Sequence, residues 1–166
     1  MSLTDRSLSS LQPAFKIKID RWLNDVKAES NSFDEQGKPK SPLSGIDFVI
    51  LETLRTFARS DELYAQGRTE PGPIVTKAKA GQSYHNFGLA LDAGPRYREK
   101  PFTWAWEKDP GLMGAMKRIA ALAKRHGIEW GGEWANFRDL SHFQDADAQP
   151  LAICRQRWPK GWQGVG

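Results

Sequence analysis

The ten residues from Ser83 to Asp92 place a strong constraint on how this chain can fold. From Leu89 onward the sequence alternates like a half-buried β-strand, with Leu89 on one face and Asp92 on the other. His85 lies seven positions before Asp92, and an odd separation would put the two side chains on opposite faces of an unbroken strand. A turn or bulge must therefore intervene, and Gly88 is the residue that permits one. A loop can then carry His85 back over the face that Asp92 occupies.

A second stretch, Asp139 to Phe143, supplies another histidine, His142, with the carboxylate of Asp139 three residues before it. Together the two stretches offer two imidazoles, one carboxylate ligand in Asp92 and one spare carboxylate. This is the donor set of a catalytic zinc site, in which three protein ligands leave a position open to water and a general base lies nearby. The simpler alternative is that both histidines are ordinary core or surface residues.

These stretches resemble a known family of enzymes. The pattern Ser-x-His-x-x-Gly-x-Ala-x-Asp, followed downstream by acid-x-x-His-aromatic, is similar to the zinc peptidases that cut bacterial cell-wall peptides. That family contains D-Ala-D-Ala carboxypeptidases and dipeptidases, and L-alanyl-D-glutamate endopeptidases including phage endolysins. The resemblance covers about residues 46–145 and is greatest for the L-alanyl-D-glutamate endopeptidase branch. Further motifs in the family's order lie at Leu63–Arg68, Ile74–Thr76, Gly127–Gly132 and His142–Gln144.

The resemblance implies a role for each residue of the site. His85, Asp92 and His142 would bind zinc, and Asp139 would be the general base that takes a proton from the attacking water and gives it to the leaving amine. Many relatives have glutamate at the position of Asp139, and aspartate also occurs there in the endopeptidase branch. Glu133 is a second candidate for the base, although it lies nine residues from His142.

Two further residues are candidates for contact with a substrate. Arg55 follows the apolar run Ile46–Leu51, and in the family pattern an arginine there contacts the substrate and the developing oxyanion. The alternative for Arg55 is a surface arginine in a salt bridge. The hydroxyl of Ser83 can bind a substrate amide or orient His85, and the alternative is a serine that only forms a turn.

The composition limits the class of protein. A chain of 166 residues is expected to form a single domain with a buried core, and 39% hydrophobic with 27% charged residues is usual for a globular protein. No run approaches the ~18 apolar residues of a membrane helix, and the N-terminal residues lack the apolar run of a secretory signal. We therefore expect no stable membrane insertion, synthesis in the cytoplasm, and action on the cell wall after release through a pore or lysis.

The charge and the cysteine content limit the partners. A net charge of +4 favours anionic surfaces without choosing among nucleic acid, teichoic acid and the acidic sacculus, and it also serves simple solubility. Since no basic run is interleaved with aromatic residues, we expect no binding to nucleic acid. The single cysteine, Cys154, excludes an intrachain disulfide. We expect a monomer that has zinc as its cofactor and the peptidoglycan stem peptide as its partner.

The periodicity of the sequence predicts an α+β fold, with a small antiparallel sheet bearing the zinc site and helices packed on one side. Apolar residues at helical spacing predict a helix over about 7–28, beginning near Gln12, and another over 111–126. His126 then lies at the end of the second helix, where a cation is favourable, and is not expected to be a ligand. A shorter helix is expected over 61–66.

The remaining segments complete the prediction. Short apolar or alternating runs predict strands over 46–51, 89–93 and 128–130. Residues 94–109, which contain two prolines and several charged residues, are expected to form a loop. Within the single domain over 1–166, the catalytic core is expected over about 46–145, followed by a basic, aromatic tail over 146–166.

Three functional hypotheses follow. The first is a zinc-dependent L-alanyl-D-glutamate endopeptidase, similar to endolysins, that cuts the stem peptide of the bacterial cell wall. The second is a D-Ala-D-Ala carboxypeptidase of the same family, which shares the metal chemistry and differs in its pocket. The third is a non-catalytic module that binds the cell wall and has lost a ligand or the base. All ligands and the base are present in the sequence, which favours an enzyme.

Overall fold

The computed structural model describes residues 4–164 of the chain. Residues 1–3 and 165–166, which hold the start of the N-terminal stretch and the end of the basic, aromatic tail, lie outside the described part. The chain divides into two compact units: unit 1 comprises Met1–Lys16, Glu52–Leu91 and Asp147–Gly166, and unit 2 comprises Ile17–Leu51 and Asp92–Ala146. Among the helices of residues 4–164, none is both long and apolar enough to cross a membrane.

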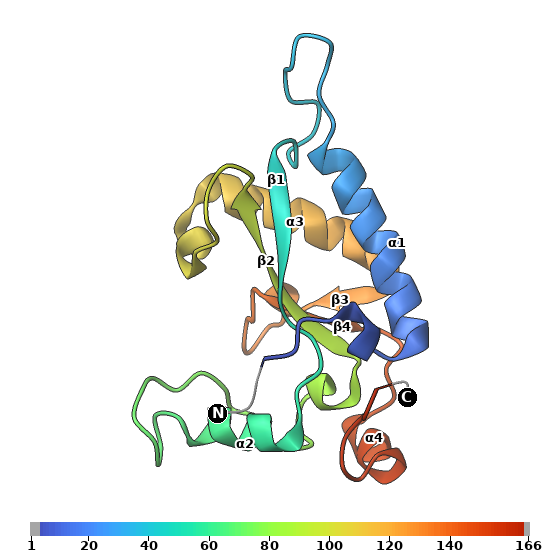
Figure 1. The fold of residues 1–166 in the computed structure, drawn as a ribbon, viewed down its shortest axis with the longest axis vertical. Helices are drawn as coiled ribbons and strands as arrows, with labels where there is room; N and C mark the ends of the chain where they lie inside the picture. The colour runs from blue at the N-terminus through green and yellow to red at the C-terminus, as the bar shows by residue number, and fades with distance from the viewer. Residues whose placement is uncertain (1–3, 165–166) are drawn as a thin grey trace. The chain divides into compact units, whose positions relative to one another are not determined.

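Unit 2 holds most of a four-stranded β-sheet with the strand order β1-β2-β4-β3 (Figure 1). The strands are β1 (Ile46–Glu52), β2 (Ala90–Tyr97), β3 (Ile128–Trp130) and β4 (His142–Asp145). The short strands β3 and β4 pair antiparallel, with Ile128 opposite Asp145 and Trp130 opposite Phe143. Together with the helices, this sheet confirms the predicted α+β class.

Two long helices confirm the predicted helical periodicity. Helix α1 spans Pro13–Ser30 and follows a 3-10 turn at Leu8–Ser10 (η1), so it begins next to its predicted start. Helix α3 spans Pro110–Arg125, and the side chain of Asp109 caps it by accepting two N–H groups of the first turn at 2.8 and 3.1 Å. The apolar stripes of the two helices are buried in the core: Leu11, Phe15, Ile19, Trp22 and Val26 of the first, and Leu112, Met116, Ile119 and Ala123 of the second.

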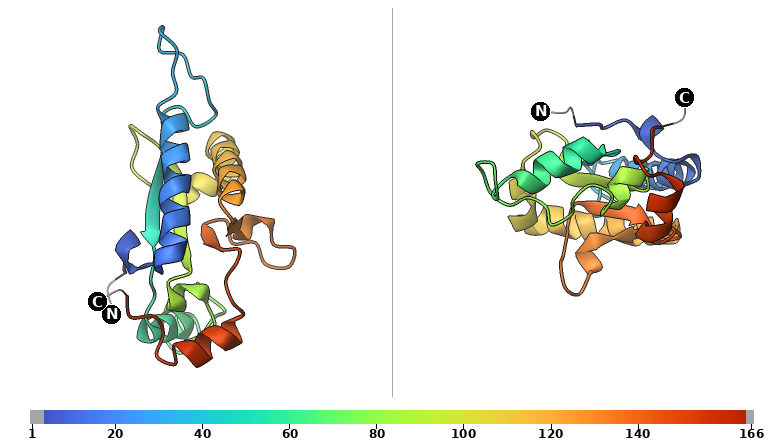
Figure 2. Two further views of the ribbon diagram at one scale, coloured as in Figure 1. Left: turned by 90° about the vertical axis from the view of Figure 1, so that its right-hand side faces the viewer. Right: turned by 90° about the horizontal axis from the view of Figure 1, so that it is seen from below.

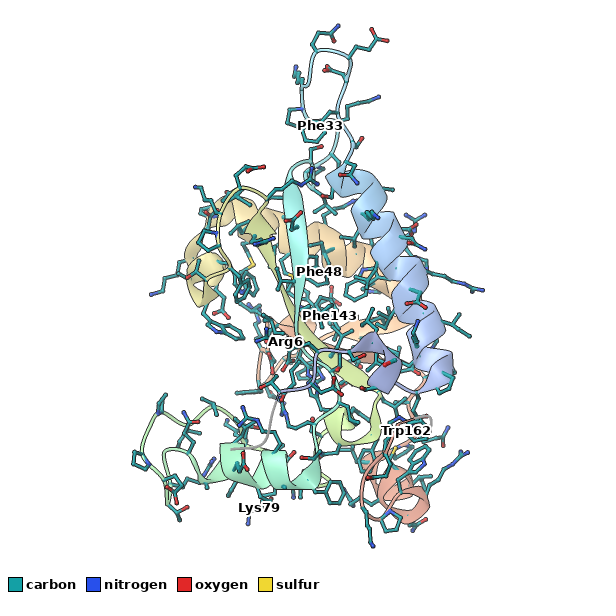
Figure 3. The ribbon with its side chains drawn as sticks, viewed as in Figure 1. Arg6, Phe33, Phe48, Lys79, Phe143 and Trp162 are labelled. Atoms are coloured by element: carbon teal, nitrogen blue, oxygen red, sulfur yellow. The ribbon has the colours of Figure 1, made fainter. Side chains whose placement is uncertain are left out.

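Trp22 joins helix and sheet in the core of unit 2. Its ring centroid lies 5.3 Å from that of Phe48 on β1 and 4.7 Å from that of Phe143 on β4 (Figure 3 labels both phenylalanines). The indole N–H of Trp22 donates to the carbonyl of Ile119 on α3 at 3.0 Å, so the buried polar atom is satisfied. Helices α1 and α3 therefore lie side by side (Figure 2), and the aromatic cluster fixes them to the sheet that carries Asp92 and His142.

Strand β2 is longer than predicted. It continues through Pro95 to Tyr97, where the sequence predicts the start of a loop, and the later part of that segment holds a 3-10 turn at Trp104–Lys108 (η3). A proline removes one ladder donor, so it is tolerated only where that donor would meet no strand. The N–H of Ala93 donates to the carbonyl of Ser141 at 2.9 Å, and residue 95 faces the same way. Since β4 begins only after Ser141, no strand residue faces Pro95 on that side.

Unit 1 contains two helices whose extents differ from the prediction. Helix α2 spans Phe57–Ala65 and begins four residues earlier than expected, because the hydroxyl of Thr56 caps it by accepting the N–H of Arg59 at 3.1 Å. Helix α4 spans Leu151–Arg157 and lies in the segment that the sequence predicts to be a closing tail. Seven residues give too short a run to show a helical period, which is why the sequence does not reveal α4.

Asn86 connects the loops of unit 1. It is buried, its side-chain oxygen accepts the N–H of Gly81 at 3.0 Å, and its amide donates to the carbonyl of Arg55 and to the hydroxyl of Ser60, both at 2.8 Å. The carbonyl of Asn86 accepts the N–H of Trp162 at 2.9 Å. These bonds hold the residue next to His85 in one position, so the turn that carries His85 is rigidly attached to unit 1.

The turn between that segment and β2 depends on Gly88. This residue ends the 3-10 turn Tyr84–Phe87 (η2) with φ +64°, in the left-handed region that favours glycine. A Cβ at this position would lie 2.7 Å from Cδ1 of Trp162 and 3.1 Å from the carbonyl oxygen of Ser10. The predicted need for a turn at Gly88 is confirmed, and the surroundings leave no room for a side chain.

We predict that Gly88→Ala lowers the free energy of unfolding by about 1–3 kcal/mol, because alanine would have to adopt a sparsely populated backbone conformation. Gly114→Ala is the matched control: this glycine lies inside α3, and a Cβ there meets nothing within 4 Å. The control is expected to raise the free energy of unfolding by up to ~1 kcal/mol. Denaturant unfolding measures both. Equal stability of Gly88→Ala and the parent chain would contradict the role of this turn.

Candidate metal centre

His85 is positioned by its turn and by a buried carbonyl. It lies in η2, and the hydroxyl of Ser83 caps that turn by accepting the backbone N–H of His85 at 3.4 Å. The ring nitrogen Nδ1 of His85 lies 2.7 Å from the carbonyl oxygen of Thr53. A carbonyl oxygen only accepts, so Nδ1 carries the hydrogen and donates it to Thr53. Ser83 thus caps the turn that carries His85, as in the alternative of a turn-forming serine, and its contact with a substrate stays a prediction.

Asp92 and His142 face each other from two strands of the sheet. Oδ1 of Asp92 on β2 lies 3.4 Å from Nδ1 of His142 on β4. The other ring nitrogen of His142, Nε2, lies 3.1 Å from the side-chain oxygen of Gln144. Because that oxygen accepts a hydrogen bond, Nε2 is the donor, and Nδ1 faces Asp92.

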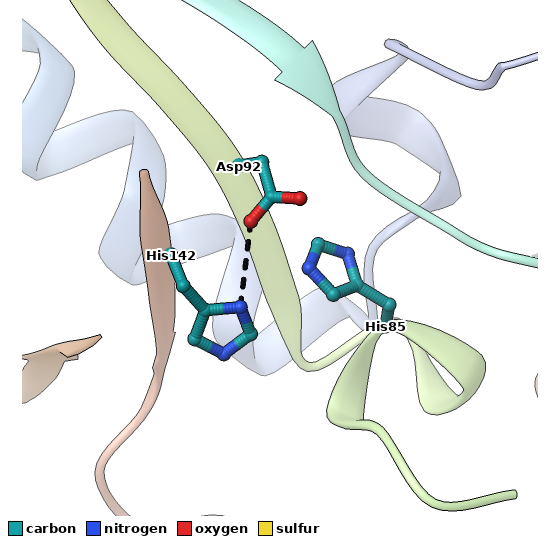
Figure 4. Close-up of side chains that lie close together, drawn as sticks. All are labelled: His85, Asp92 and His142. Atoms are coloured by element: carbon teal, nitrogen blue, oxygen red, sulfur yellow. Dashed lines mark ion pairs between the residues drawn. The ribbon is translucent and has the colours of Figure 1, made fainter. Parts of the chain in front are cut away.

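The three predicted ligands come together. One ligand atom from each of His85, Asp92 and His142 can be chosen so that these atoms all lie within 4.8 Å of one another (Figure 4). Both histidines are buried, and one ring nitrogen of each faces an oxygen acceptor. Two imidazoles and one carboxylate are a ligand set for a catalytic zinc site, in which three protein ligands leave a further position for water. The residues therefore fit a metal ion.

The charges around His142 favour a cation. Burial disfavours the charged imidazole, but the hydrogen bond and the charge of Asp92, with the further charge of Asp139, outweigh it and raise the pKa of His142 above its ordinary value of 6.5. The same carboxylates that attract a proton to this ring in the metal-free chain would attract a metal ion to it. The electrostatic field at His142 is thus suited to hold positive charge.

Asp139 lies at the start of the segment that leads into β4. Its N–H donates to the carbonyl of Gly131 at 3.1 Å, its carbonyl accepts the N–H of His142 at 3.3 Å, and its carboxylate accepts the hydroxyl of Ser141 at 3.1 Å. Asp139 is thus held beside His142, and its role as a general base stays a prediction. The other candidate, Glu133, is exposed at the end of the 3-10 turn Gly131–Glu133 (η4).

Arg55 is linked to His85 through the backbone. The N–H of Arg55 donates to the carbonyl of His85 at 3.1 Å, and its guanidinium forms an ion pair with Glu52 in which Nε donates to Oε2 at 2.8 Å. Only 11% of the Arg55 side chain and 10% of the Glu52 side chain are exposed. The alternative of a salt bridge is therefore real, but the pair lies largely beneath the surface, and it holds the guanidinium in a defined place.

The third histidine serves a different purpose. His126 follows the last residue of α3, as predicted, and its Nε2 lies 2.8 Å from a carboxylate oxygen of Asp25 on α1. The interaction joins the two helices of unit 2. His126 therefore provides an internal comparison for the two histidines of the metal centre.

Three residues that support the centre have no role assigned from the sequence. Thr53 acts through its backbone carbonyl, which has no sequence signature. Gln144 lies in one of the family motifs and follows His142 by two residues, so the strand period puts it on the same face, which is the available signal. Glu129 accepts the Gln144 amide from the neighbouring strand, a pairing that only the register of β3 and β4 reveals.

The chain is similar to several known proteins. Residues 76–145 match a protein family described as D-alanyl-D-alanine carboxypeptidase. The chain is 44% identical over 102 residues to the peptidoglycan L-alanyl-D-glutamate endopeptidase CwlK of Bacillus subtilis (strain 168), which covers 60% of this chain and 61% of that protein. It is 33% identical over 105 residues to the L-alanyl-D-glutamate peptidase of Listeria phage A118, covering 63% of this chain and 32% of that protein. The chain thus spans less than two thirds of each relative's length.

A solved structure has a similar fold. The L-Ala D-Glu endopeptidase ChiX of Serratia marcescens superposes with a TM-score of 0.52 and 22% sequence identity, over 87% of this chain and 89% of that chain. At this identity the similarity shows the fold. The sequence matches confirm the family resemblance that the motifs predicted.

We predict that His85→Ala and His142→Ala each weaken the binding of zinc by more than the ~10–100-fold typical of an outer partner, because each removes a direct ligand. His126→Ala is the matched control and should bind zinc as the parent chain does. Competition with a chromogenic chelator, together with metal analysis of dialysed protein, measures both affinity and stoichiometry. Loss of zinc binding in His126→Ala, or its retention in His142→Ala, would contradict the assigned ligand set.

Proposed function

We propose that this chain is a zinc-dependent hydrolase of peptidoglycan stem peptides that cuts the bond between L-alanine and D-glutamate. The observation that carries the proposal is the convergence of His85, Asp92 and His142, whose ligand atoms lie within 4.8 Å of one another. The relatives from Bacillus subtilis and the Listeria phage are both named for the L-alanyl-D-glutamate bond, which supports the choice of substrate.

The metal proposed for this site is zinc. Zn²⁺ prefers nitrogen and carboxylate ligands at short distances, and three protein ligands leave a position for water. When bound, such an ion lowers the pKa of a water molecule toward ~7 and polarises the scissile carbonyl. His85 and His142 would each bind through the ring nitrogen that does not face its oxygen acceptor, and Asp92 through a carboxylate oxygen.

Asp139 is the proposed general base. It is held next to His142 by backbone hydrogen bonds on both sides, so its carboxylate has a fixed position relative to one of the ligands. We infer that this carboxylate takes the proton of the attacking water and then donates it to the leaving amine. Glu133 is less suited to this step, since it is exposed on a separate turn.

Arg55 is the proposed partner of the developing oxyanion. Its backbone is bonded to His85, and the carboxylate of Glu52 holds its guanidinium in a largely buried position. A fixed cation in a site of low dielectric stabilises a developing negative charge more strongly than a mobile surface arginine does. Ser83 is proposed to contact a substrate amide in addition to capping the turn of His85.

The proposed substrate also defines the setting. We propose that the protein acts as a monomer on the cell wall and reaches it through a pore or upon lysis. The alternative reaction, removal of a terminal D-alanine, has one observation in its favour: the family that matches residues 76–145 is described as D-alanyl-D-alanine carboxypeptidase. The two reactions release different products, so one experiment separates them.

Digestion of purified sacculi, analysed by mass spectrometry with and without a chelator, tests the proposal. We expect new peptides that begin with D-glutamate, lost upon chelation and restored by zinc. Free D-alanine as the sole product would replace the endopeptidase with the carboxypeptidase. No released product from several wall types would overturn the proposed substrate, and a chain that also binds no zinc would leave the cell-wall-binding module as the better hypothesis.

We predict that Asp139→Asn lowers kcat by about 10²–10⁴-fold while zinc affinity changes little, because an amide cannot accept the proton that the carboxylate takes. Glu133→Gln is the matched change at the other candidate base and should retain most of the activity. Steady-state cleavage of a synthetic stem peptide, with zinc content measured on the same samples, compares the two. The reverse order of effects would assign the base to Glu133.

A further inference from the structure

A chain of side chains extends outward from His142 across β3 and β4. Nε2 of His142 lies 3.1 Å from Oε1 of Gln144, the amide of Gln144 donates to Oε2 of Glu129 at 2.9 Å, and the indole N–H of Trp134 donates to Oε1 of the same glutamate at 2.5 Å. All four residues belong to unit 2, and the antiparallel register sets Glu129 directly opposite Gln144. The sheet therefore builds this chain of contacts.

The contacts have a direction. A glutamate carboxylate only accepts hydrogen bonds, so the end of the Gln144 amide that faces Glu129 must be the NH₂ group. The carbonyl end of that amide then faces His142, and since it also only accepts, the hydrogen of the neutral ring must lie on Nε2. Glu129 thus determines the tautomer of an imidazole that it does not touch.

Asp92 acts on the same ring in the opposite sense. Its carboxylate lies 3.4 Å from Nδ1 of His142 and would favour a hydrogen on that nitrogen in the metal-free chain. A ring protonated on Nδ1 has no lone pair on the side of Asp92 and cannot bind a metal there. The amide of Gln144 opposes this tendency, so the balance between Asp92 and Gln144 decides whether the free site is ready for a metal.

Trp134 restrains the same ring and the same carboxylate. Its ring centroid lies 5.2 Å from that of His142 with the planes inclined by 49°, while its N–H holds Glu129. Because Glu129 is otherwise exposed, a single hydrogen bond would leave its carboxylate mobile. Two donors, one from a neighbouring strand and one from the loop after η4, hold it in one orientation.

We propose that Glu129, Gln144 and Trp134 form a positioning relay that keeps neutral His142 protonated on Nε2 and so prepares its Nδ1 for the metal. None of the three touches the metal, and each acts through its neighbour. The relay goes beyond the proposed function, and it rests on that function only in taking His142 as a ligand. It requires that Gln144 matter for metal affinity and that Glu129 matter only while Gln144 is present.

The variants follow from the directions of the bonds. Gln144→Met keeps the length of the side chain and removes both the acceptor and the donor. Glu129→Gln keeps the shape of the side chain. The new amide has a donor end and an acceptor end, so it can pair with either end of the Gln144 amide and no longer fixes its orientation. Glu107→Gln, at an exposed glutamate of η3, is the matched control. The double variant Glu129→Gln with Gln144→Met tests whether Glu129 acts through Gln144.

Two readouts test the relay. The first is ¹H–¹⁵N correlation of the His142 imidazole in the metal-free protein, at a pH where this ring is neutral. In the parent chain we expect the hydrogen on Nε2. In Gln144→Met, and to a smaller extent in Glu129→Gln, we expect the population to shift toward rings with the hydrogen on Nδ1. The second is the zinc dissociation constant by chelator competition, which should rise about tenfold in Gln144→Met and less in Glu129→Gln. Unfolding curves establish that each variant is folded.

The outcomes separate the relay from the proposed function. The relay would be overturned if Glu129→Gln had the same effect in the Gln144→Met background as it has alone. It would also be overturned if the tautomer and zinc affinity of Gln144→Met matched those of Glu107→Gln. If the parent chain binds no zinc, the proposed function fails, while the tautomer measurement on the metal-free protein still tests the relay. An effect of Gln144→Met on KM alone, with tautomer and affinity unchanged, would assign Gln144 to substrate contact instead.

Discussion

The left-handed turn at Gly88 is the constraint on which the metal centre depends. His85 and Asp92 are separated by an odd number of residues, so a continuous strand would point them apart. The turn ends η2, in which the cap by Ser83 and the hydrogen bonds of Asn86 position His85. Strand β2, which carries Asp92, follows the turn. The backbone conformation of Gly88, with φ +64°, therefore brings His85 of η2 and Asp92 of β2 together as a pair of ligands. Glycine is required there because other atoms already fill the space for a Cβ.

Neutral oxygen acceptors, and not carboxylates, orient both histidines of the centre. The carbonyl of Thr53 binds Nδ1 of His85, and the amide oxygen of Gln144 binds Nε2 of His142. A neutral acceptor orients the ring without adding a further negative charge beside it, whereas His126, which joins two helices near the surface, is paired directly with a carboxylate. Among the three proposed ligands only Asp92 is negatively charged. The charge of Glu129 is separated from His142 by the side chain of Gln144.

Features with a local pattern can be predicted from the sequence, whereas features that depend on pairing between distant segments cannot. The stripe through Trp22 and the alternation around Asp92 follow from the periods of helix and strand, and the spacing around Gly88 requires a turn. The motifs alone group the three ligands. The sequence predicts a loop at Pro95, because nothing local shows that its missing donor faces a side without a strand. The carbonyl of Thr53 and the pairing of Glu129 with Gln144 arise only from tertiary contact and strand register.

The electrostatics of the centre make a proton and a metal ion alternatives at the same nitrogen. Asp92 and Asp139 raise the pKa of His142 in the metal-free chain, so protonation of this ring contributes stability that is fully present below its ordinary pKa of 6.5 and is lost as the pH rises through the raised value. Above that range two carboxylates remain beside a neutral, buried imidazole. A cation that binds only the folded chain restores the missing positive charge and stabilises the fold by mass action. The arrangement that makes the free site electrostatically unfavourable above the raised pKa of His142 is therefore the same arrangement that would attract a metal ion.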